Sequence, residues 1–229
     1  LTQMQVIEAR KGDVEIAKYA KRVTIEAVNK YGAEIAVQKT DDAFLAELQN
    51  SVMNDFYTFL GTGSLTGTSK NIQKALAVAK GAVLNRFMGM NKTVTEVVGF
   101  VNVNALYEYL GDAAITVQSA FGIQYIKDFL GYNTIILLPD NLLTKTKVIA
   151  CPVENIDLYY VDPADSDFAK LGLEYTVEGE TNLIGFHVEG SYDTASGDAY
   201  ALMGMKLWAE YLDGICVMSI GSTEAAPTV

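Results

Sequence analysis

The feature that most restricts the fold is a long amphipathic stretch in the first quarter of the chain. Its apolar side chains recur at spacings of three and four residues, at Leu45, Leu48, Val52, Phe56 and Phe59. This spacing places them in one stripe along an α-helix. The sequence therefore predicts a helix over residues 41–60 that buries one face against the rest of the protein.

Signals at both ends delimit this helix. Thr40 or Asp41 can accept a backbone N–H of the first turn. Gly61-Thr62-Gly63-Ser64 follows the last turn, where glycine readily adopts the conformation that ends helices. We expect a polar loop at 66–69 and a second helix over 69–88, ended by Gly89.

Strand patterns flank the two helices. Alternation of apolar and polar residues predicts half-buried strands at 22–29 and 34–39. Later apolar runs predict strands at 97–103, 134–138, 147–152, 155–161 and 214–220, and a hairpin of 173–178 with 183–192. Helices are expected at 104–110 and 120–130, each ended by a glycine. This order indicates an α+β fold, not a regular βαβ alternation.

Charge is unevenly distributed along the 229 residues, whose net charge is −11. Residues 1–92 carry 12 basic and 9 acidic side chains, whereas residues 93–229 carry 5 and 19. The acidic part should repel nucleic acid and anionic membranes. The less acidic part either pairs electrostatically with neighbouring subunits or forms solvated faces, and charge alone fits both interpretations.

Composition limits the class of protein further. Half of the residues are hydrophobic, which is enough for one or two domains with real cores. No apolar run approaches the roughly 18 residues of a membrane span, and no signal peptide is visible. Thirteen Tyr and nine Phe suit either a protein–protein interface or a core.

The sequence offers little for catalysis or for cofactor binding. His187 is the single histidine and lies in an alternating strand, where a structural role is the usual one. A metal or haem site therefore lacks a ligand set, and a serine or cysteine triad would have to use His187. Cys151 and Cys216 lie in apolar, strand-like segments and are expected to be buried free thiols of a reducing compartment.

Two further patterns bear on binding chemistry. The glycine-rich segment at 61–64 follows a helix, whereas a phosphate-binding loop follows a strand and opens a helix. Asp162, Asp165 and Asp167 have an alternating spacing, but the glycine and closing glutamate of a calcium loop are missing, which favours a solvated acidic loop. A pair of carboxylates for glycoside hydrolysis would need a separation that sequence does not provide. We therefore expect no catalytic residue, no metal site and no cofactor.

Four stretches, in this order, carry a resemblance to a known family. They are Val28–Gly32 with Ala36–Gln38 and Thr40–Phe44; Leu60–Ser64; Gly99–Asn104 with Tyr107–Leu110; and Phe129–Pro139 with Val153–Tyr160. They resemble, respectively, the strand entering the spine helix, the glycine turn after it, the first axial strand and helix, and a strand–turn–strand block. Together they are similar to the major capsid proteins of tailed bacteriophages and prophages, the Hong Kong-phage-type capsid fold.

The resemblance implies a division of the chain. A partial extended loop is expected at 1–22, a peripheral domain with a long spine helix and an antiparallel sheet at 23–92, and an axial α/β domain at 93–168. Return strands of the peripheral domain are expected at 169–198, a final axial segment at 199–221 and a disordered tail at 222–229.

The resemblance also implies a function. The chain would be a structural subunit, not an enzyme, and would assemble with copies of itself into pentamers and hexamers that enclose DNA. Its partners would be those copies, a scaffolding protein and packaged DNA bound without sequence specificity, with no membrane. It would be assembled in the cytoplasm of a bacterial host and reside in the virion. An encapsulin-like shell, another phage structural protein of the tail or decoration type, and a carboxylate hydrolase are the alternatives.

Overall fold

The computed structural model describes residues 13–111, 117–120, 123–177, 183–221 and 225–228. These residues form two compact units, described here separately. Unit 1 comprises Leu1–Ala46 and Leu158–Lys206, and unit 2 comprises Glu47–Asp157 and Leu207–Val229. The bounds of these two units differ from the bounds predicted for the peripheral and axial domains. The assignment of those two domains therefore stays a prediction.

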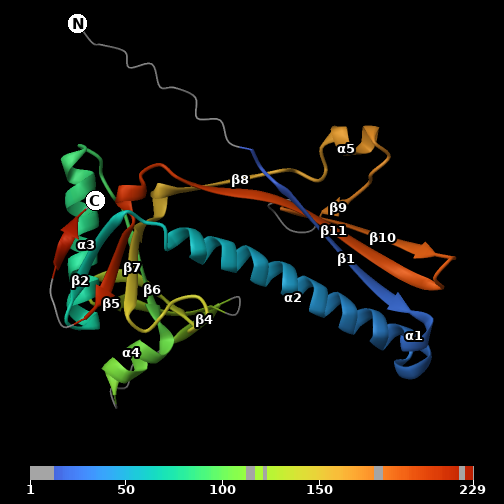
Figure 1. Cartoon of the computed structure of the whole chain (residues 1–229), viewed down its shortest axis with the longest axis horizontal. Coiled ribbons are helices and arrows are strands. Elements are labelled where there is room, and N and C mark those ends of the chain that lie inside the picture. The colour runs from blue at the N-terminus through green and yellow to red at the C-terminus, as the bar shows by residue number, and fades with distance from the viewer. Residues whose placement is uncertain (1–12, 112–116, 121–122, 178–182, 222–224, 229) are drawn as a thin grey trace, which may run out of the picture. The chain divides into compact units, whose positions relative to one another are not determined.

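Unit 1 is built on an antiparallel sheet with the strand order β1-β11-β10-β9 (Figure 1). The strands are β1 (Ile16–Thr24), β11 (Ser196–Ala209), β10 (Ile184–Ser191) and β9 (Thr176–Val177), and β8 (Ile156–Tyr160) also pairs with β11. Its helices are α1 (Ile25–Tyr31), the first part of α2 (Ala33–Leu60) and the short α5 (Ser166–Lys170). Because the pairs are regular, alternate residues of neighbouring strands share one face of the sheet.

One face of this sheet is covered by α2. Phe44 is almost fully buried and packs edge-on against Phe186 of β10, with the two ring centroids 6.3 Å apart. Lys21 of β1 lies over the same Phe44 ring. The aromatic pair therefore joins the helix to the sheet by apolar burial and by a favourable ring geometry.

Unit 2 contains an eight-stranded mixed sheet with the order β13-β2-β12-β7-β3-β6-β5-β4. The strands are β2 (Leu65–Ser69), β3 (Val97–Asn102), β4 (Gln118–Ala120), β5 (Ile123–Phe129), β6 (Tyr132–Leu138), β7 (Lys147–Pro152), β12 (Cys216–Ile220) and β13 (Ala225–Thr228). The β2–β12 and β3–β6 pairs are parallel, and the others are antiparallel. Helices α3 (Ile72–Gly89) and α4 (Val103–Leu110) and the 3-10 turns η1 (Val153–Asn155) and η2 (Leu212–Gly214) complete the unit.

Both faces of the unit 2 sheet are buried. Val148 and Ala150 of β7 belong to the core that includes α3, whereas their neighbours Ile149 and Cys151 belong to the core that includes Leu60 of α2. Successive side chains of a strand point to opposite faces. The sheet therefore lies between α3 on one side and the end of α2 on the other, which explains why β7 is apolar without alternation.

A buried polar cluster fixes the start of α4. Asn102 is fully buried, and its Oδ1 accepts the backbone N–H of Ala105 at 3.0 Å, which caps the helix. Its Nδ2 donates to Asp140 Oδ1 and to the Leu143 carbonyl, both at 2.7 Å. Asn104 donates to the other oxygen of Asp140 at 2.9 Å. The amide thus ties the helix start to the loop after β6 with its hydrogen bonds satisfied.

Several predicted elements are confirmed. The helix predicted over 41–60 is the later part of α2 and ends at Leu60 as predicted, but its predicted start is wrong, because α2 begins at Ala33 and Thr40 and Asp41 lie inside it. The second helix is α3, capped by Asn71. The predicted helix at 104–110 is α4, and β3, β6, β7, β8 and β12 lie at the five predicted strands. The predicted hairpin is the antiparallel pair of β9 with β10, although 178–182 lie outside the described residues.

Two strands predicted before the long helix are wrong. The segment after Thr24 is α1, and the segment predicted as a strand at 34–39 is the first part of α2, which begins at Ala33. Residues 33–39 are rich in Ala, Glu, Gln and Lys, which favour helix. Gly32 separates the two helices with a φ of 83°, a conformation that glycine adopts without strain.

Three later predictions are also wrong. The helix predicted at 120–130 is replaced by β4 and β5, with residues 121–122 outside the described part. β5 is rich in Ile, Tyr and Phe, which suit a strand, and it pairs with β6 through a tight turn at Gly131. The predicted polar loop at 66–69 is β2, and the tail predicted to be disordered contains β13, which pairs with β2.

Candidate functional site

The two cysteines occupy opposite faces of the unit 2 sheet. Cys151 belongs to the core beside α2, and Cys216 belongs to the core beside α3. Both are buried free thiols, as predicted. Burial raises the pKa of each thiol to about 12, because a thiolate is poorly solvated there. These buried, apolar surroundings differ from the electropositive ones that activate a nucleophilic cysteine.

The acidic loop and the glycine-rich turn have structural roles. Asp162 Oδ1 accepts the N–H of Ala164, and Asp165 caps α5 by accepting the N–H of Asp167. Gly63 packs against the backbone of Ile215 and not around an open cradle. Within the described ranges, no group of three or more His, Cys, Asp or Glu residues is arranged to hold a metal ion.

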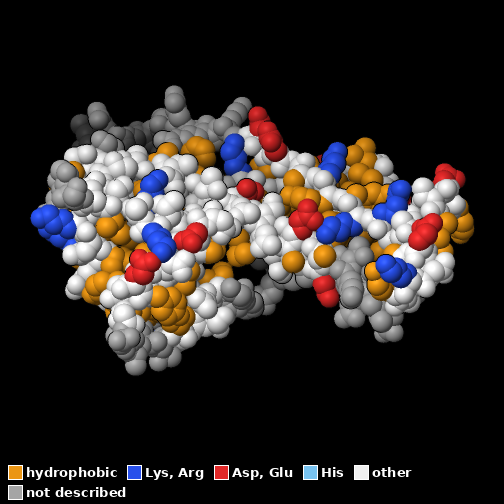
Figure 2. Space-filling view, turned by 60° about the horizontal axis from the view of Figure 1, so that its bottom comes forward, with side chains coloured by type: hydrophobic (Ala, Val, Ile, Leu, Met, Phe, Trp, Pro, Cys, Tyr) orange, Lys and Arg blue, Asp and Glu red, His pale blue; other side chains and the backbone are white. Residues whose placement is uncertain are grey.

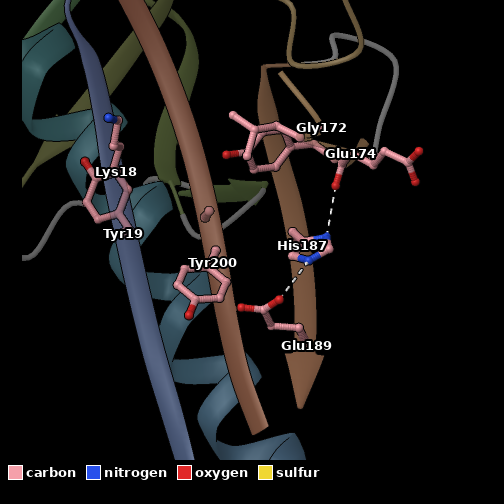
Figure 3. Close-up of a pocket in the computed structure, with 10 residues that line it drawn as sticks. Lys18, Tyr19, Gly172, Glu174, His187, Glu189 and Tyr200 are labelled. Atoms are coloured by element: carbon pink, nitrogen blue, oxygen red, sulfur yellow. Dashed lines mark hydrogen bonds and ion pairs between the residues drawn. The ribbon is translucent and has the colours of Figure 1, made fainter. Parts of the chain in front are cut away.

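His187 lies in a pocket of about 310 Å³ on unit 1 (Figure 3). The pocket is lined from β1, β10, β11 and the segment 172–175. His187 Nδ1 lies 3.0 Å from the carbonyl oxygen of Glu174, and Nε2 lies 3.8 Å from Glu189 Oε2. The His187 and Tyr200 rings are 6.4 Å apart and tilted by 31°. The sequence identified His187 but not Glu174 or Tyr200, and the register of β10 and β11 places Tyr200 opposite the histidine.

An ion pair crosses the same sheet beside this pocket. Arg22 of β1 donates from Nε and from an Nη to the two oxygens of Asp198 on β11, both at 2.7 Å. Ser196 donates to Asp198 Oδ1 at 2.9 Å. The hydrogen bonds and charge of Arg22 hold the pKa of Asp198 below its usual range, and Asp198 raises the pKa of Arg22. This bidentate pair fixes the register of the two strands.

Two groups of large apolar side chains are among those exposed on unit 1. Leu158, Tyr159 and Tyr160 lie in β8, with Tyr159 57% exposed. Ile25 and Tyr192 lie near the β10–β11 turn, where they help to line a second hollow of about 420 Å³. On the face shown in Figure 2, apolar and oppositely charged side chains of the described residues are interspersed. Exposed clusters of this kind mark surfaces that contact other proteins.

No helix in the described part of the chain is both long and apolar enough to cross a bilayer.

Comparisons with known proteins identify the fold. No protein-family model matches the chain, and no curated protein matches it in sequence. A structure from Mycobacterium phage Che8 matches 95% of this chain and 76% of its own, with a TM-score of 0.57 and 14% identity. The mature capsid of bacteriophage PhiM1 matches 97% of this chain and 80% of its own, with a TM-score of 0.52 and 8% identity. The SrpI encapsulin of Synechococcus elongatus PCC 7942 matches 95% of this chain and 80% of its own, with a TM-score of 0.53 and 11% identity.

These likenesses extend over nearly the whole chain and are not confined to one unit. The protein therefore has the α+β fold of phage capsid proteins, which an encapsulin shares. The predicted resemblance is confirmed at the level of fold. At these identities the likeness establishes the fold, and function is inferred separately.

Proposed function

We propose that the protein is a structural subunit of an icosahedral phage or prophage capsid. The observation that carries the proposal is the likeness to a mature phage capsid over 97% of the chain. A shell needs each subunit to present several patches to neighbours in closed rings. The exposed apolar groups on β8 and near the β10–β11 turn supply patches of this kind.

The proposed role is assembly and not catalysis. Pentamers and hexamers of this chain would enclose DNA, with a scaffolding protein as a further partner and the packaged DNA bound without sequence specificity. Assembly would take place in the host cytoplasm, and the product would be a virion component. The peripheral and axial domains predicted from the sequence are proposed as the parts that make contacts between and within these rings.

A second candidate is an encapsulin-like shell, which the match to the SrpI encapsulin favours. Both candidates form closed shells and differ in their contents. Nuclease-resistant DNA inside purified particles would support the capsid, whereas a protein cargo without DNA would support the encapsulin-like shell.

The proposal is tested by the size of the particles that the protein forms. We expect rings or closed shells in electron micrographs and a matching mass by light scattering. The double variant Tyr159→Ser, Tyr160→Ser should shift the protein towards smaller species if β8 forms a contact. Gln124→Ser, an exposed polar change in β5, is the matched control. A wild-type protein that stays monomeric at every concentration and salt, alone and with scaffolding protein, would overturn the proposal.

A further inference from the structure

Two hydrogen-bond acceptors face each other in the pocket around His187. Its Nδ1 lies 3.0 Å from the Glu174 carbonyl oxygen. A carbonyl oxygen only accepts, so Nδ1 carries the proton of the neutral ring. The other nitrogen, Nε2, is then an acceptor, and it faces the carboxylate oxygen of Glu189 at 3.8 Å. An N–H donor placed between these atoms would satisfy both.

The side chains around the pocket leave room for a ligand between His187 Nε2 and Glu189. Arg22 directs Nε and one Nη to Asp198, so these two donors of its guanidinium are engaged there. Burial, the charges of Asp198 and Glu189 and a hydrogen bond to Glu189 raise the pKa of Tyr200, so its phenol stays neutral; the Glu189 carboxylate can accept further donors beside it. Lys18 lines the pocket from β1, which β11 separates from the strand of His187. The negative charge of Glu189 therefore favours a cation here.

The pocket walls suit the apolar part of such a ligand. Tyr200 lines it together with the His187 ring (Figure 3), and Tyr175 is also part of its lining. Aromatic faces attract organic cations, most strongly where water is partly excluded. The cavity of about 310 Å³ is at the lower end of the range found for small-molecule sites. A chain of a few methylene groups fits this volume and these walls.

We propose that this pocket binds an alkylammonium group, with its N–H groups donating to His187 Nε2 and Glu189 and its methylenes lying along Tyr175 and Tyr200. The same chemistry has two sources, a free aliphatic diamine or the lysine side chain of another protein copy. Two protein ligands are too few for a stable metal site, which favours the ammonium over a divalent cation. Because His187 and Glu189 are each about half exposed, binding should be weak, on the order of millimolar. The site is independent of the proposed shell role.

The single histidine makes the test direct, because the imidazole nitrogen resonances belong to one residue. The wild-type protein is titrated with 1,5-diaminopentane at constant ionic strength and constant pH. We expect a saturable shift of the Nε2 resonance, with no such shift from the uncharged 1,5-pentanediol. Glu189→Gln should weaken binding about tenfold, and Glu154→Gln, an exposed change in unit 2, should leave it unchanged.

A second series separates the two sources. Raising the protein concentration without amine should produce the same Nε2 shift if a lysine of another copy fills the pocket, and added diamine should then compete. A shift that needs added diamine and is independent of protein concentration identifies a free amine. Either result supports the site. No saturable shift in either series, or equal diamine affinity of wild type and Glu189→Gln, overturns it.

Discussion

Replacement of Gly63 by alanine should strongly destabilise unit 2. A Cβ at this position would lie 2.6 Å from the carbonyl oxygen of Ile215 and 2.7 Å from its Cγ2. Side-chain carbons do not approach that closely, so one segment must move. Ile215 is fully buried in the core beside α2 and has little room to yield. Overpacking typically costs 1–3 kcal/mol, and a clash with backbone favours the upper end, about 3 kcal/mol.

The assay is urea unfolding followed by the fluorescence of Trp208, the single tryptophan, which lies in unit 2. Because the chain has two compact units, this transition is assigned to the unit that contains the reporter. Gly81→Ala is the matched control. Nothing lies within 4 Å of a Cβ at Gly81, which is in the interior of α3, so alanine should stabilise by about 1 kcal/mol.

The two glycines thus give opposite signs for the same chemical change. An ordinary surface substitution changes the free energy of unfolding by about 0.5 kcal/mol or less. If Gly63→Ala differs from wild type by no more than this, the close approach of Gly63 to Ile215 is not what positions the start of β2. A loss of stability in Gly81→Ala would likewise contradict the open space beside α3.

Three further predictions concern buried polar groups and thiols. Asn102→Ala should destabilise unit 2 by about 2–3 kcal/mol in the same urea assay, because a helix cap and buried hydrogen bonds are lost. Because the folded-state pKa of Asp198 is lowered, its contribution to stability is complete above its unfolded-state pKa and disappears as pH falls through the folded-state value. Between about pH 5 and pH 2, the melting temperature of Asp198→Asn should therefore fall less than that of the wild type. Cys151 and Cys216, with pKa values of about 12, should resist iodoacetamide at about pH 8 in the native protein and react quickly in urea; equal rates would contradict their burial.

The sequence predicted best those elements whose apolar pattern is set by a large contact area. The α3 stripe of Ile72, Leu76, Ala79, Val83 and Phe87 is buried along its whole length, so its 3.6-residue period is clear. β7 was equally clear, because burial on both faces leaves a continuous apolar run. The glycine-rich segment after Leu60 marked the end of α2 correctly, and Gly63 within this segment approaches Ile215 closely.

Prediction failed where local pattern and tertiary pairing disagree. The apolar side chains Ile35 and Val37 alternate with polar ones as in a strand, but this segment is the beginning of α2. Six residues are too few to distinguish the two-residue period of a strand from the 3.6-residue period of a helix. The segment of β5 lacks strict alternation, and what makes it a strand is the partner β6. Likewise β13 is a strand because the edge of β2 is available to it, which composition does not record.

At the candidate site, too, the local sequence pattern predicted some of the features, and tertiary pairing determined the others. Sequence singled out His187 and the alternation around it, which placed Glu189 on the same face. Tyr200 and Tyr175 came from other segments, and only the strand register brings them to the histidine. The Arg22–Asp198 pair joins residues 176 positions apart, a separation that no local pattern reveals.

The pairing of β1 with β11 also sets a time for folding during synthesis. Ile16 pairs with Gly204, and the whole of β1 depends on β11 for its partner strand. At about 5–20 residues per second, a ribosome needs roughly 10–40 s to make the intervening 188 residues. The chain of unit 2 up to Asp157 is complete well before then. A nascent chain therefore carries β1 without its partner strand while these residues are made, and the sheet of unit 1 cannot close until β11 emerges.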